Sequence, residues 1–472
     1  MTAPAFSITA IDLFERPVRL RLPFRFGVVT LTACPQAFVR ATIRMPDGRE
    51  ATGASAEMIV PKWFDKNLAL SNEDNFAQLR AVLDMAREAY LADRAPDTAF
   101  GHFARHYDAH LAAAGARDFN PLLANYGPAL IDRALLDALC RGLGIDFYNA
   151  LKANLPGIDA RRAEFAGLDM DRFLAATAPA QTIEARHTVG LVDPISAADA
   201  RERVGDGLPE TLEEVVAHYG HRYFKLKVGG DPAADIARLE AIAAVLDARN
   251  APYYATLDGN EQYADADAVA DLLARVRGAP RLARLAASIL FVEQPINRKT
   301  ALEADFKASP LGLPVIIDES DGTLDTFVIA RERGYTGVSS KTCKGLYKSI
   351  LNAARCAHWN AAQGGTRYFM SAEDLTTQAG LAVQQDLALI NLIGIGHVER
   401  NGHHYVDGMA ACPAAEQADF LSAHPDLYER SHGAARVAIR DGRLAIASLA
   451  CRGFASAALP DFSAMAPLVA PT

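Results

Sequence analysis

Apolar and polar positions alternate in the first part of the chain, and this pattern predicts antiparallel strands over residues 6–20 and 35–57. The segment PDGRE interrupts the second run, and its Asp47-Gly48 pair predicts a hairpin turn. Over residues 75–92 and 126–144 the apolar residues recur three and four positions apart, which predicts helices. Gly142 and Gly144 end the second of these patterns. Residues 1–155 are therefore expected to form an α+β domain.

From about residue 184 short apolar runs alternate with helix-like segments. Eight short apolar runs each lead into a polar or charged tip: HTVGLVD, YFKLKVGG, YYATLDGNEQ, ILFVEQP, PVIIDES, YTGVSSK, YFMSAED and IGHVER. Such alternation is typical of parallel strands joined by helical crossovers, and eight units favour a TIM-type barrel over residues 156–432. Residues 433–472 return to a β pattern with an Asp441-Gly442 turn, and we expect them to pack near the first domain.

Charged side chains recur at the ends of successive predicted strands. They are Lys225 and Lys227, then Asp258, Glu293, Asp318 and Lys341. From Lys227 onward the spacings are 31, 35, 25 and 23 residues, each about one strand-plus-helix unit. Because the carboxyl ends of parallel barrel strands meet at one face, all six side chains are expected to surround one cavity.

Three converging carboxylates would repel one another unless a cation lay between them. A hard divalent cation takes oxygen ligands, so Asp258, Glu293 and Asp318 predict a site for Mg²⁺, with Mn²⁺ as an alternative. No cysteine or histidine joins this cluster, which argues against zinc. Asn260 and Glu319 follow two of the ligands and are expected to orient them.

The lysines suggest acid–base chemistry. Strand alternation places Lys225 and Lys227 on one face, and Lys341, four strands later, approaches from the opposite side. A lysine close to a cation or to another lysine is expected to have a lowered pKa, so that it can act as a base. A metal flanked by two bases suits removal of a weakly acidic proton next to a carboxylate.

The ordered set KLK, LDGN, VEQP, IDES and SSK resembles the muconate lactonizing enzyme subgroup of the enolase superfamily, which includes mandelate racemase and the dipeptide epimerases. The resemblance covers nearly the whole chain. It implies that residues 1–155 form a capping domain completed by the C-terminal tail, over a (β/α)7β barrel. It also implies that Asp258, Glu293 and Asp318 bind Mg²⁺, that Lys227 and Lys341 exchange protons, and that Lys225 is their electrostatic neighbour.

Two features leave the details open. The family usually has Gly-Gly after the lysine of the sixth strand, whereas this chain has KTCKGLYKS, so Lys344 competes with Lys341 for the role of second base. The resemblance implies that apolar loops at residues 22–31 and 56–64 close the barrel mouth. Candidate substrate contacts are Phe24, Phe26 and Trp63 in these loops, with Glu373, Asp374 and Glu399 at the last two strand ends.

The expected activity is abstraction of the proton α to a substrate carboxylate through an enediolate, as in a racemase, epimerase or cycloisomerase. A dehydratase acting on an acid sugar could use the same site. A different class is a metal-free barrel enzyme in which Lys225 or Lys227 forms a Schiff base with the substrate.

Composition restricts the partners. The formal net charge of −9 gives no support to nucleic-acid binding, and no apolar stretch is long enough to cross a membrane. Six scattered cysteines and the early charges Asp12, Glu15 and Arg16 lead us to expect a cytoplasmic protein with a small-molecule carboxylate substrate. The resemblance implies a homo-oligomer.

Histidines provide a second set of candidates. His102, His106 and His110 are spaced to lie on one helix face, which we interpret as solvated. His403 and His404 follow the eighth predicted strand. A loop role is favoured for them, with a catalytic base as the alternative.

Overall fold

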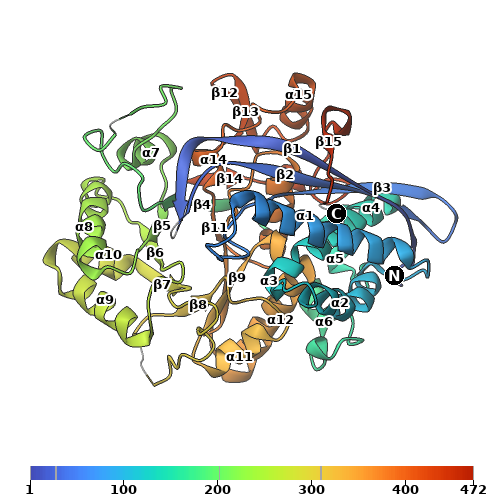
Figure 1. Cartoon of the computed structure of the whole chain (residues 1–472), viewed down its shortest axis with the longest axis horizontal. Coiled ribbons are helices and arrows are strands. Elements are labelled where there is room, and N and C mark those ends of the chain that lie inside the picture. Colours follow the sequence, from blue (N-terminus) through green and yellow to red (C-terminus); the bar gives the residue numbers. More distant parts are fainter. Residues whose placement is uncertain (1, 27–28, 201, 309–310, 471–472) are drawn as a thin grey trace.

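The computed structural model describes residues 2–26, 29–200, 202–308 and 311–470. It begins with a sheet of three long antiparallel strands, covered by helices (Figure 1). The strands are β1 (Ser7–Phe26), β2 (Val29–Arg44) and β3 (Glu50–Met58). The helices that follow are α1 (Asn72–Ala92), α2 (Ala99–Gly115), α3 (Pro121–Ala124), α4 (Tyr126–Leu143), α5 (Phe147–Lys152) and α6 (Met170–Ala175).

Local sequence signals explain where these elements begin and end. The predicted hairpin joins β2 to β3, with Gly48 in the left-handed region at φ 84°. Ser71 caps α1 by accepting a hydrogen bond from the backbone N–H of Asp74, and the Asp74 carboxylate accepts from the Ser71 backbone in return. Helix α4 ends at Leu143 because Gly144 takes the left-handed conformation, with φ 70°.

Eight parallel strands form a closed barrel, as the alternating pattern predicts. They pair in chain order, and the last strand pairs with the first to complete the ring. The strands are β4 (Thr182–Val189), β5 (Tyr223–Lys227), β6 (Tyr254–Asp258), β7 (Ile289–Glu293), β8 (Val315–Ile317), β9 (Gly337–Ser340), β10 (Phe369–Ala372) and β11 (His397–Glu399).

Helices connect the barrel strands and cover its outside (Figure 1). They are α7 (Leu212–Tyr219), α8 (Pro232–Ala248), α9 (Ala266–Gly278), α10 (Ala283–Ser288), α11 (Thr326–Glu332), α12 (Leu346–Gln363) and α13 (Leu381–Leu392). The short helix α14 (Gly402–Tyr405) follows the last barrel strand. Helix α10 is an extra element between β6 and β7, which explains the long interval between Asp258 and Glu293.

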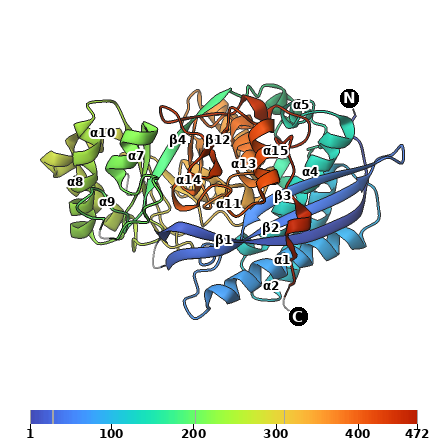
Figure 2. The ribbon, with the colours of Figure 1, turned by 90° about the horizontal axis from the view of Figure 1, so that it is seen from above.

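The C-terminal segment contacts both the barrel and the N-terminal sheet. It contains α15 (Ala414–Ala423), β12 (Tyr428–Ser431), β13 (Ala434–Val437), β14 (Arg443–Ala445) and β15 (Ala466–Pro467). After the predicted Asp441-Gly442 turn, β14 pairs antiparallel with β4 of the barrel. Strand β15 then pairs with β1, so the last described strand lies on the N-terminal sheet, as Figure 2 shows.

One hydrophobic core extends from the N-terminal sheet into the barrel. Helix α4 packs against β2 and β3 on one side and close to α12 on the other. Leu130, Leu139, Leu351 and Leu387 belong to the same buried cluster, while a second cluster lies beneath α8 and α9. The domain boundaries near residues 155 and 433 stay predictions.

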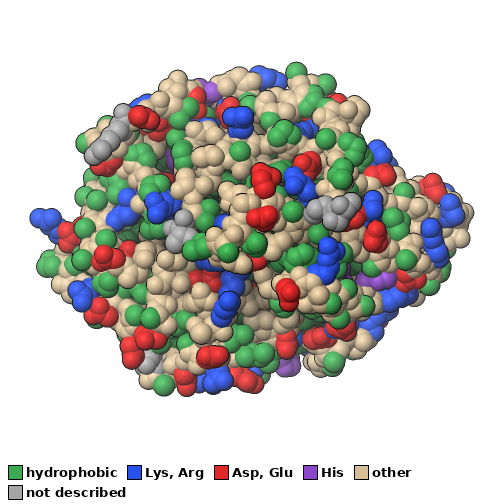
Figure 3. Space-filling model, in the orientation of Figure 1, with side chains coloured by type: hydrophobic (Ala, Val, Ile, Leu, Met, Phe, Trp, Pro, Cys, Tyr) green, Lys and Arg blue, Asp and Glu red, His purple; other side chains and the backbone are tan. Residues whose placement is uncertain are grey.

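The far end of β1 lies beside the barrel mouth. Leu20 forms a bridge with Val406, and the Arg21 guanidinium donates to the His404 carbonyl at 2.9 Å. Acidic and basic side chains are interspersed over the described residues of the face in Figure 3. Within the described ranges, no helix combines the length and the apolar character needed to cross a bilayer.

Candidate active site

Strand register places three of the predicted site residues side by side. Lys227, Asp258 and Glu293 are direct partners across β5, β6 and β7. Lys227 donates from Nζ to Oδ2 of Asp258 at 2.5 Å. Burial raises the pKa of Asp258, but the two ammonium groups of Lys225 and Lys227 outweigh it and hold that pKa below its usual value.

Lys225 lies at the centre of the barrel mouth, where its ammonium group contacts four carboxylates. Its Nζ is 3.0 Å from Asp258, 2.9 Å from Glu293, 2.7 Å from Glu373 and 3.0 Å from Glu399. Burial alone would lower the pKa of Lys225, but the carboxylates raise it well above its usual value. The expected lowering of this pKa is therefore wrong, and the geometry gives no support to a Schiff base on Lys225.

Asp318 follows β8 and is held from the next strand. Its Oδ2 accepts from Lys341 Nζ at 2.6 Å, and its other oxygen accepts from the Ser339 hydroxyl. Lys344 contacts the same residue from behind, with Nζ 3.1 Å from the Asp318 carbonyl and 2.8 Å from Ser339 Oγ. Lys341 lines the central cavity and Lys344 does not. Although burial opposes it, Asp318 raises the pKa of Lys341, again contrary to expectation.

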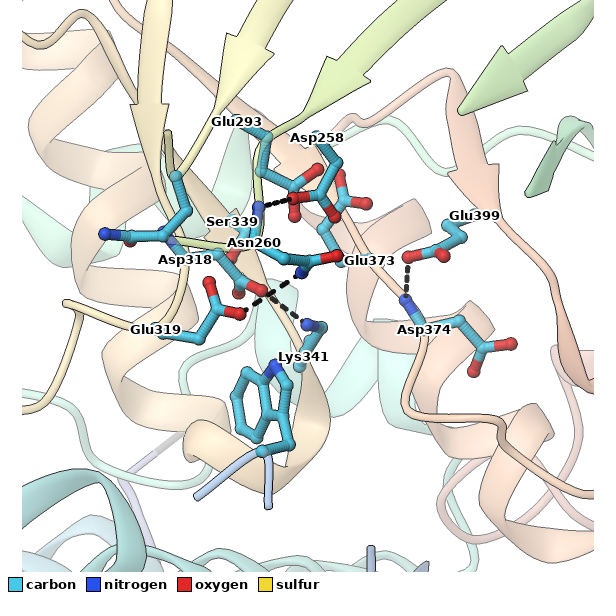
Figure 4. A network of polar contacts seen from close by, with 12 residues as sticks. Asp258, Asn260, Glu293, Asp318, Glu319, Ser339, Lys341, Glu373, Asp374 and Glu399 are labelled. Atoms are coloured by element: carbon cyan, nitrogen blue, oxygen red, sulfur yellow. Dashed lines mark hydrogen bonds and ion pairs between the residues drawn. The ribbon is translucent and has the colours of Figure 1, made fainter. Parts of the chain in front are cut away.

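The carboxylate set fits a hard divalent cation. Asp258, Glu293 and Asp318 come from neighbouring strand ends and are each at most 1% exposed (Figure 4). Glu293 Oε2 is buried without a hydrogen-bond partner. Burial, with Asp258 and Glu373 nearby, raises the pKa of Glu293 well above its usual value. An oxygen-seeking cation would satisfy this oxygen and relieve the repulsion.

Asn260 and Glu319 lie beside these carboxylates, where the sequence predicts them. The Asn260 backbone N–H donates to Asp258 Oδ1 at 2.8 Å, and its side-chain amide lies 3.4 Å from Glu319 Oε1. Asn260 has a φ of 40°, a conformation that asparagine tolerates better than most residues. Burial raises the pKa of Glu319. The ammonium group of Lys66, whose Nζ is 3.8 Å from Glu319 Oε1, acts in the opposite direction.

The acidic residues after β10 and β11 have different positions. Glu373 lies below the cavity lining, where Arg186 and Lys225 hold its carboxylate. Asp374 lines the cavity and accepts from the backbone N–H groups of Asn401 and Gly402 at 2.9 and 3.0 Å. It therefore ties the two last strand ends together.

Glu399 also lines the cavity. Its Oε1 accepts from the Thr188 hydroxyl at 2.5 Å, and its Oε2 accepts from the Asp374 backbone at 2.9 Å. Burial opposes the effect, but Lys225 and Lys227 hold the pKa of Glu399 well below its usual value. The neighbouring ammonium groups therefore favour the charged form of the Glu399 carboxylate.

Apolar side chains of the N-terminal domain close the cavity. Phe24, Val60 and Trp63 line it together with the strand-end residues. The Trp63 ring lies over Lys341, with Nζ 4.2 Å from the ring centroid. Phe26 ends β1, but its side chain lies outside the described part of the structure.

An arginine and a lysine attach the loop that holds Trp63 to the barrel. Arg298, after β7, donates to the carbonyls of Trp63 and Phe64 at 2.8 and 3.0 Å and to Glu261 at 2.9 Å. Lys66 donates in the other direction, to the Asn260 carbonyl at 2.9 Å. This attachment fixes the apolar cover above the carboxylates.

Several supporting residues were missed from the sequence. Arg186 lies inside the barrel on β4, one residue before the apolar run at residues 187–193, and its place two residues before Thr188 is the available signal. Gln294 accepts from the backbone N–H groups of Asp318 and Ser320 at 2.8 and 3.0 Å. No sequence pattern indicated that contact, because it joins two loops that are distant along the chain.

The three histidines of α2 do not form a solvated face. His102 and His110 are buried, and each pairs through Nε2 with a backbone carbonyl, that of Phe6 or Ala124, at 2.9 Å. His106 stacks on Tyr90. The interpretation of a solvated helix face was wrong because α2 is covered by neighbouring segments on more than one side.

The fold corresponds to that of a known family. A family model described as enolase C-terminal domain-like matches residues 207–450, just over half of the chain. The chain therefore belongs to this family, within the enolase superfamily. No curated protein sequence matches it.

Solved structures share the whole architecture at low identity. An isomerase from Streptomyces coelicolor A3(2) is 15% identical, with 97% of each chain covered and a TM-score of 0.60. A dipeptide epimerase from Enterococcus faecalis V583, complexed with Mg and a dipeptide, is 15% identical over 85% of this chain and 92% of that one, with a TM-score of 0.57. An enolase from Bradyrhizobium, complexed with magnesium and mandelic acid, is 16% identical over 93% of each chain, with a TM-score of 0.56. At such identities the likeness shows the fold alone.

Proposed function

We propose that this enzyme removes the proton α to the carboxylate of a small molecule in a magnesium-dependent reaction, as a racemase, epimerase or cycloisomerase. The observation that carries the proposal is the placement of two amines. Lys227 ends β5 and Lys341 follows β9, four strands further round the eight-stranded barrel, and both line one cavity. The motif order resembles that of the muconate lactonizing subgroup, and a dehydratase is the alternative outcome on the same site.

Asp258, Glu293 and Asp318 would hold the Mg²⁺, and Mn²⁺ offers similar preferences. Bound there, the ion would act as a Lewis acid that stabilises the negative charge gained by the substrate carboxylate as the α-proton leaves. Asn260 would keep Asp258 oriented through its backbone N–H.

Each lysine would hold or accept a proton at Nζ. An amine on each side of a planar α-carbon can take the proton from one face and return one to the other, which is what inversion of configuration requires. The contacts of Lys227 with Asp258 and of Lys341 with Asp318 orient the two Nζ atoms toward the shared cavity. Lys225 is better suited to screening four carboxylates than to proton exchange.

Phe24, Val60 and Trp63 would exclude water from the reacting atoms and contact the part of the substrate remote from its carboxylate. Of the acidic candidates, Asp374 and Glu399 line the cavity and are proposed to select polar groups on the substrate. A small cavity with an apolar cover on one side and charged strand ends on the other suits a compact organic acid.

Incubation of a library of chiral carboxylates in D₂O with Mg²⁺ tests this function. We expect deuterium at the α-carbon of at least one compound with the wild type, loss of exchange with EDTA, and its recovery on adding Mg²⁺. Lys227→Ala and Lys341→Ala should each lose exchange with at least one enantiomer. Full exchange by both variants would remove the lysines from the mechanism, and trapping of a substrate adduct by borohydride would favour the Schiff-base alternative instead.

A further inference from the structure

A second cluster of ligand atoms lies outside the barrel wall. His187 is on β4, His221 precedes β5, and His403 is on α14. One ring nitrogen from each lies within 4.8 Å of the other two. Arg186 and Thr188 direct their side chains into the barrel, so strand alternation directs His187 to the opposite face, away from the carboxylates.

The nitrogens of this cluster lack the partners that buried polar atoms usually have. His187 is 2% exposed and His221 is 0% exposed, yet His187 Nδ1 and His221 Nε2 have no hydrogen bond. His403 has at most the Arg400 backbone carbonyl as a partner for one ring nitrogen, which leaves the other without one. An unsatisfied buried polar atom is costly, and three together in one small space indicate a missing common partner.

The surroundings prepare the rings for coordination. His221 pairs through Nδ1 with the Ala185 carbonyl at 3.0 Å, which leaves Nε2 with a free lone pair if Nδ1 carries the proton. The His187 and His221 rings are stacked with centroids 5.3 Å apart, and His403 is 5.6 and 5.4 Å from them. His403 is half-buried as a residue, although its two ring nitrogens are buried.

We propose that His187, His221 and His403 bind one divalent transition-metal ion, with Zn²⁺ as the preferred species, at a site separate from the carboxylates. Imidazole nitrogen suits ions of this kind, whereas Mg²⁺ prefers oxygen. A tetrahedral zinc with Zn–N bonds of about 2.1 Å places its nitrogens about 3.4 Å apart, so the rings would close by about 1.4 Å at most. Water, or His404 from beside His187, would complete the coordination.

The ion would fasten three segments that meet the active site. Helix α14 directly follows Glu399 and Asn401, which line the cavity, and it ends at Tyr405, whose ring is 4.3 Å from that of Phe24. Fixing His403 to β4 and to the start of β5 would hold this end of the barrel mouth and the tip of β1 in place. The site therefore has a structural role that does not depend on which reaction is catalysed.

The test is zinc binding in the presence of excess Mg²⁺, which keeps zinc from the carboxylates. Chelator-stripped protein incubated with Zn²⁺ and passed through gel filtration should retain one equivalent of zinc and melt at a higher temperature. Co²⁺ in place of zinc should give the visible absorption of a four-coordinate nitrogen site. His403→Gln and His187→Gln should each weaken zinc binding by roughly 100-fold or more, because loss of a direct ligand exceeds the effect of outer-shell changes.

Two controls separate this site from others. His358→Gln changes an exposed histidine on α12 and should bind zinc like the wild type, and so should Glu293→Gln at the carboxylates. Wild-type affinity in both cluster variants would overturn the proposal. So would loss of zinc from the Glu293→Gln variant, or failure of the wild type to retain zinc in excess Mg²⁺.

Discussion

The ammonium group of Lys341 lies 2.6 Å from Oδ2 of Asp318, so one proposed proton-exchanging residue directly contacts one proposed metal ligand. The same carboxylate is 3.2 Å from Lys344, which approaches from the side away from the cavity. The two lysines are three residues apart in the chain but differ in access to a substrate. This difference separates their expected roles.

Lys341→Met is expected to lower α-proton exchange by about 100-fold or more, because general acid–base groups contribute at least that much. Lys344→Met should weaken Mg²⁺ binding through Asp318 but retain exchange within about tenfold of the wild type at saturating Mg²⁺. The measurement is the exchange rate in D₂O as a function of Mg²⁺ concentration. The reverse order of effects would assign the second proton-exchanging role to Lys344.

Arg298→Met should loosen the loop over residues 59–66. The substitution removes the hydrogen bonds to the carbonyls of Trp63 and Phe64 and leaves Glu261 with Lys66 as its remaining cation. We expect faster amide hydrogen exchange in this loop and a rise in KM of about tenfold, since each lost charge-assisted hydrogen bond costs about 1.5 kcal/mol or more.

Arg281→Met is the matched control, because its side chain is 83% exposed and lies 3.6 Å from its acidic partner. Equal amide exchange over residues 59–66 in the Arg298→Met variant and the wild type would show that the loop is held by other contacts.

Gly53→Ala should strongly destabilise the protein. A Cβ at Gly53 would lie 2.1 Å from the Ala138 backbone nitrogen and 2.4 Å from the Ala134 carbonyl oxygen, so β3 and α4 would have to separate. We expect a loss of about 3 kcal/mol or more in the free energy of unfolding, measured by denaturant titration.

Gly115→Ala serves as the comparison, because a Cβ there meets nothing within 4 Å. It should be neutral or stabilising by about 0.5 kcal/mol. Similar stability of the Gly53→Ala and Gly115→Ala variants would contradict the close approach of β3 and α4.

His424→Gln should make the protein more resistant to acid. Burial lowers the pKa of His424 from 6.5 to about 4, and its Nε2 accepts from the Ala457 backbone at 3.1 Å. The unfolded chain therefore binds a proton at higher pH than the folded one, so stability is full above pH 6.5 and falls as the pH decreases toward 4.

The shift corresponds to about 3 kcal/mol at most. Unfolding midpoints measured between pH 7 and 4 should decline less steeply in His424→Gln than in the wild type, and His358→Gln should follow the wild type. An unchanged slope in His424→Gln would show that His424 is not protonated on unfolding in this range.

The strand-end residues could be predicted because a parallel barrel gathers the ends of its strands. Lys227, Asp258, Glu293, Asp318 and Lys341 lie around one mouth as their order predicts, and their chemical roles stay proposals. The β2–β3 hairpin and the end of α4 could also be predicted, from Asp47-Gly48 and from Gly144, because these signals depend on local backbone preference.

What the sequence did not indicate depends on long-range neighbours. The four carboxylates around Lys225 include Glu373 and Glu399, 148 and 174 residues away, and they reverse the direction expected for its pKa. Arg298 reaches Trp63 across the interface of two regions. His187, His221 and His403 come together only because β11 closes the ring onto β4. The local pattern of apolar and polar residues does not indicate such contacts between distant segments.

The burial of α4 on both flanks limits how this enzyme can diversify. In a chimera with residues 1–155 from a relative, the apolar side chains of the new α4 would have to pack against those of α12. Without such packing, apolar surface would be exposed and the chimera would aggregate. We therefore expect point substitutions at Phe24, Val60 and Trp63 to change the cavity lining at a lower cost in stability than exchange of residues 1–155.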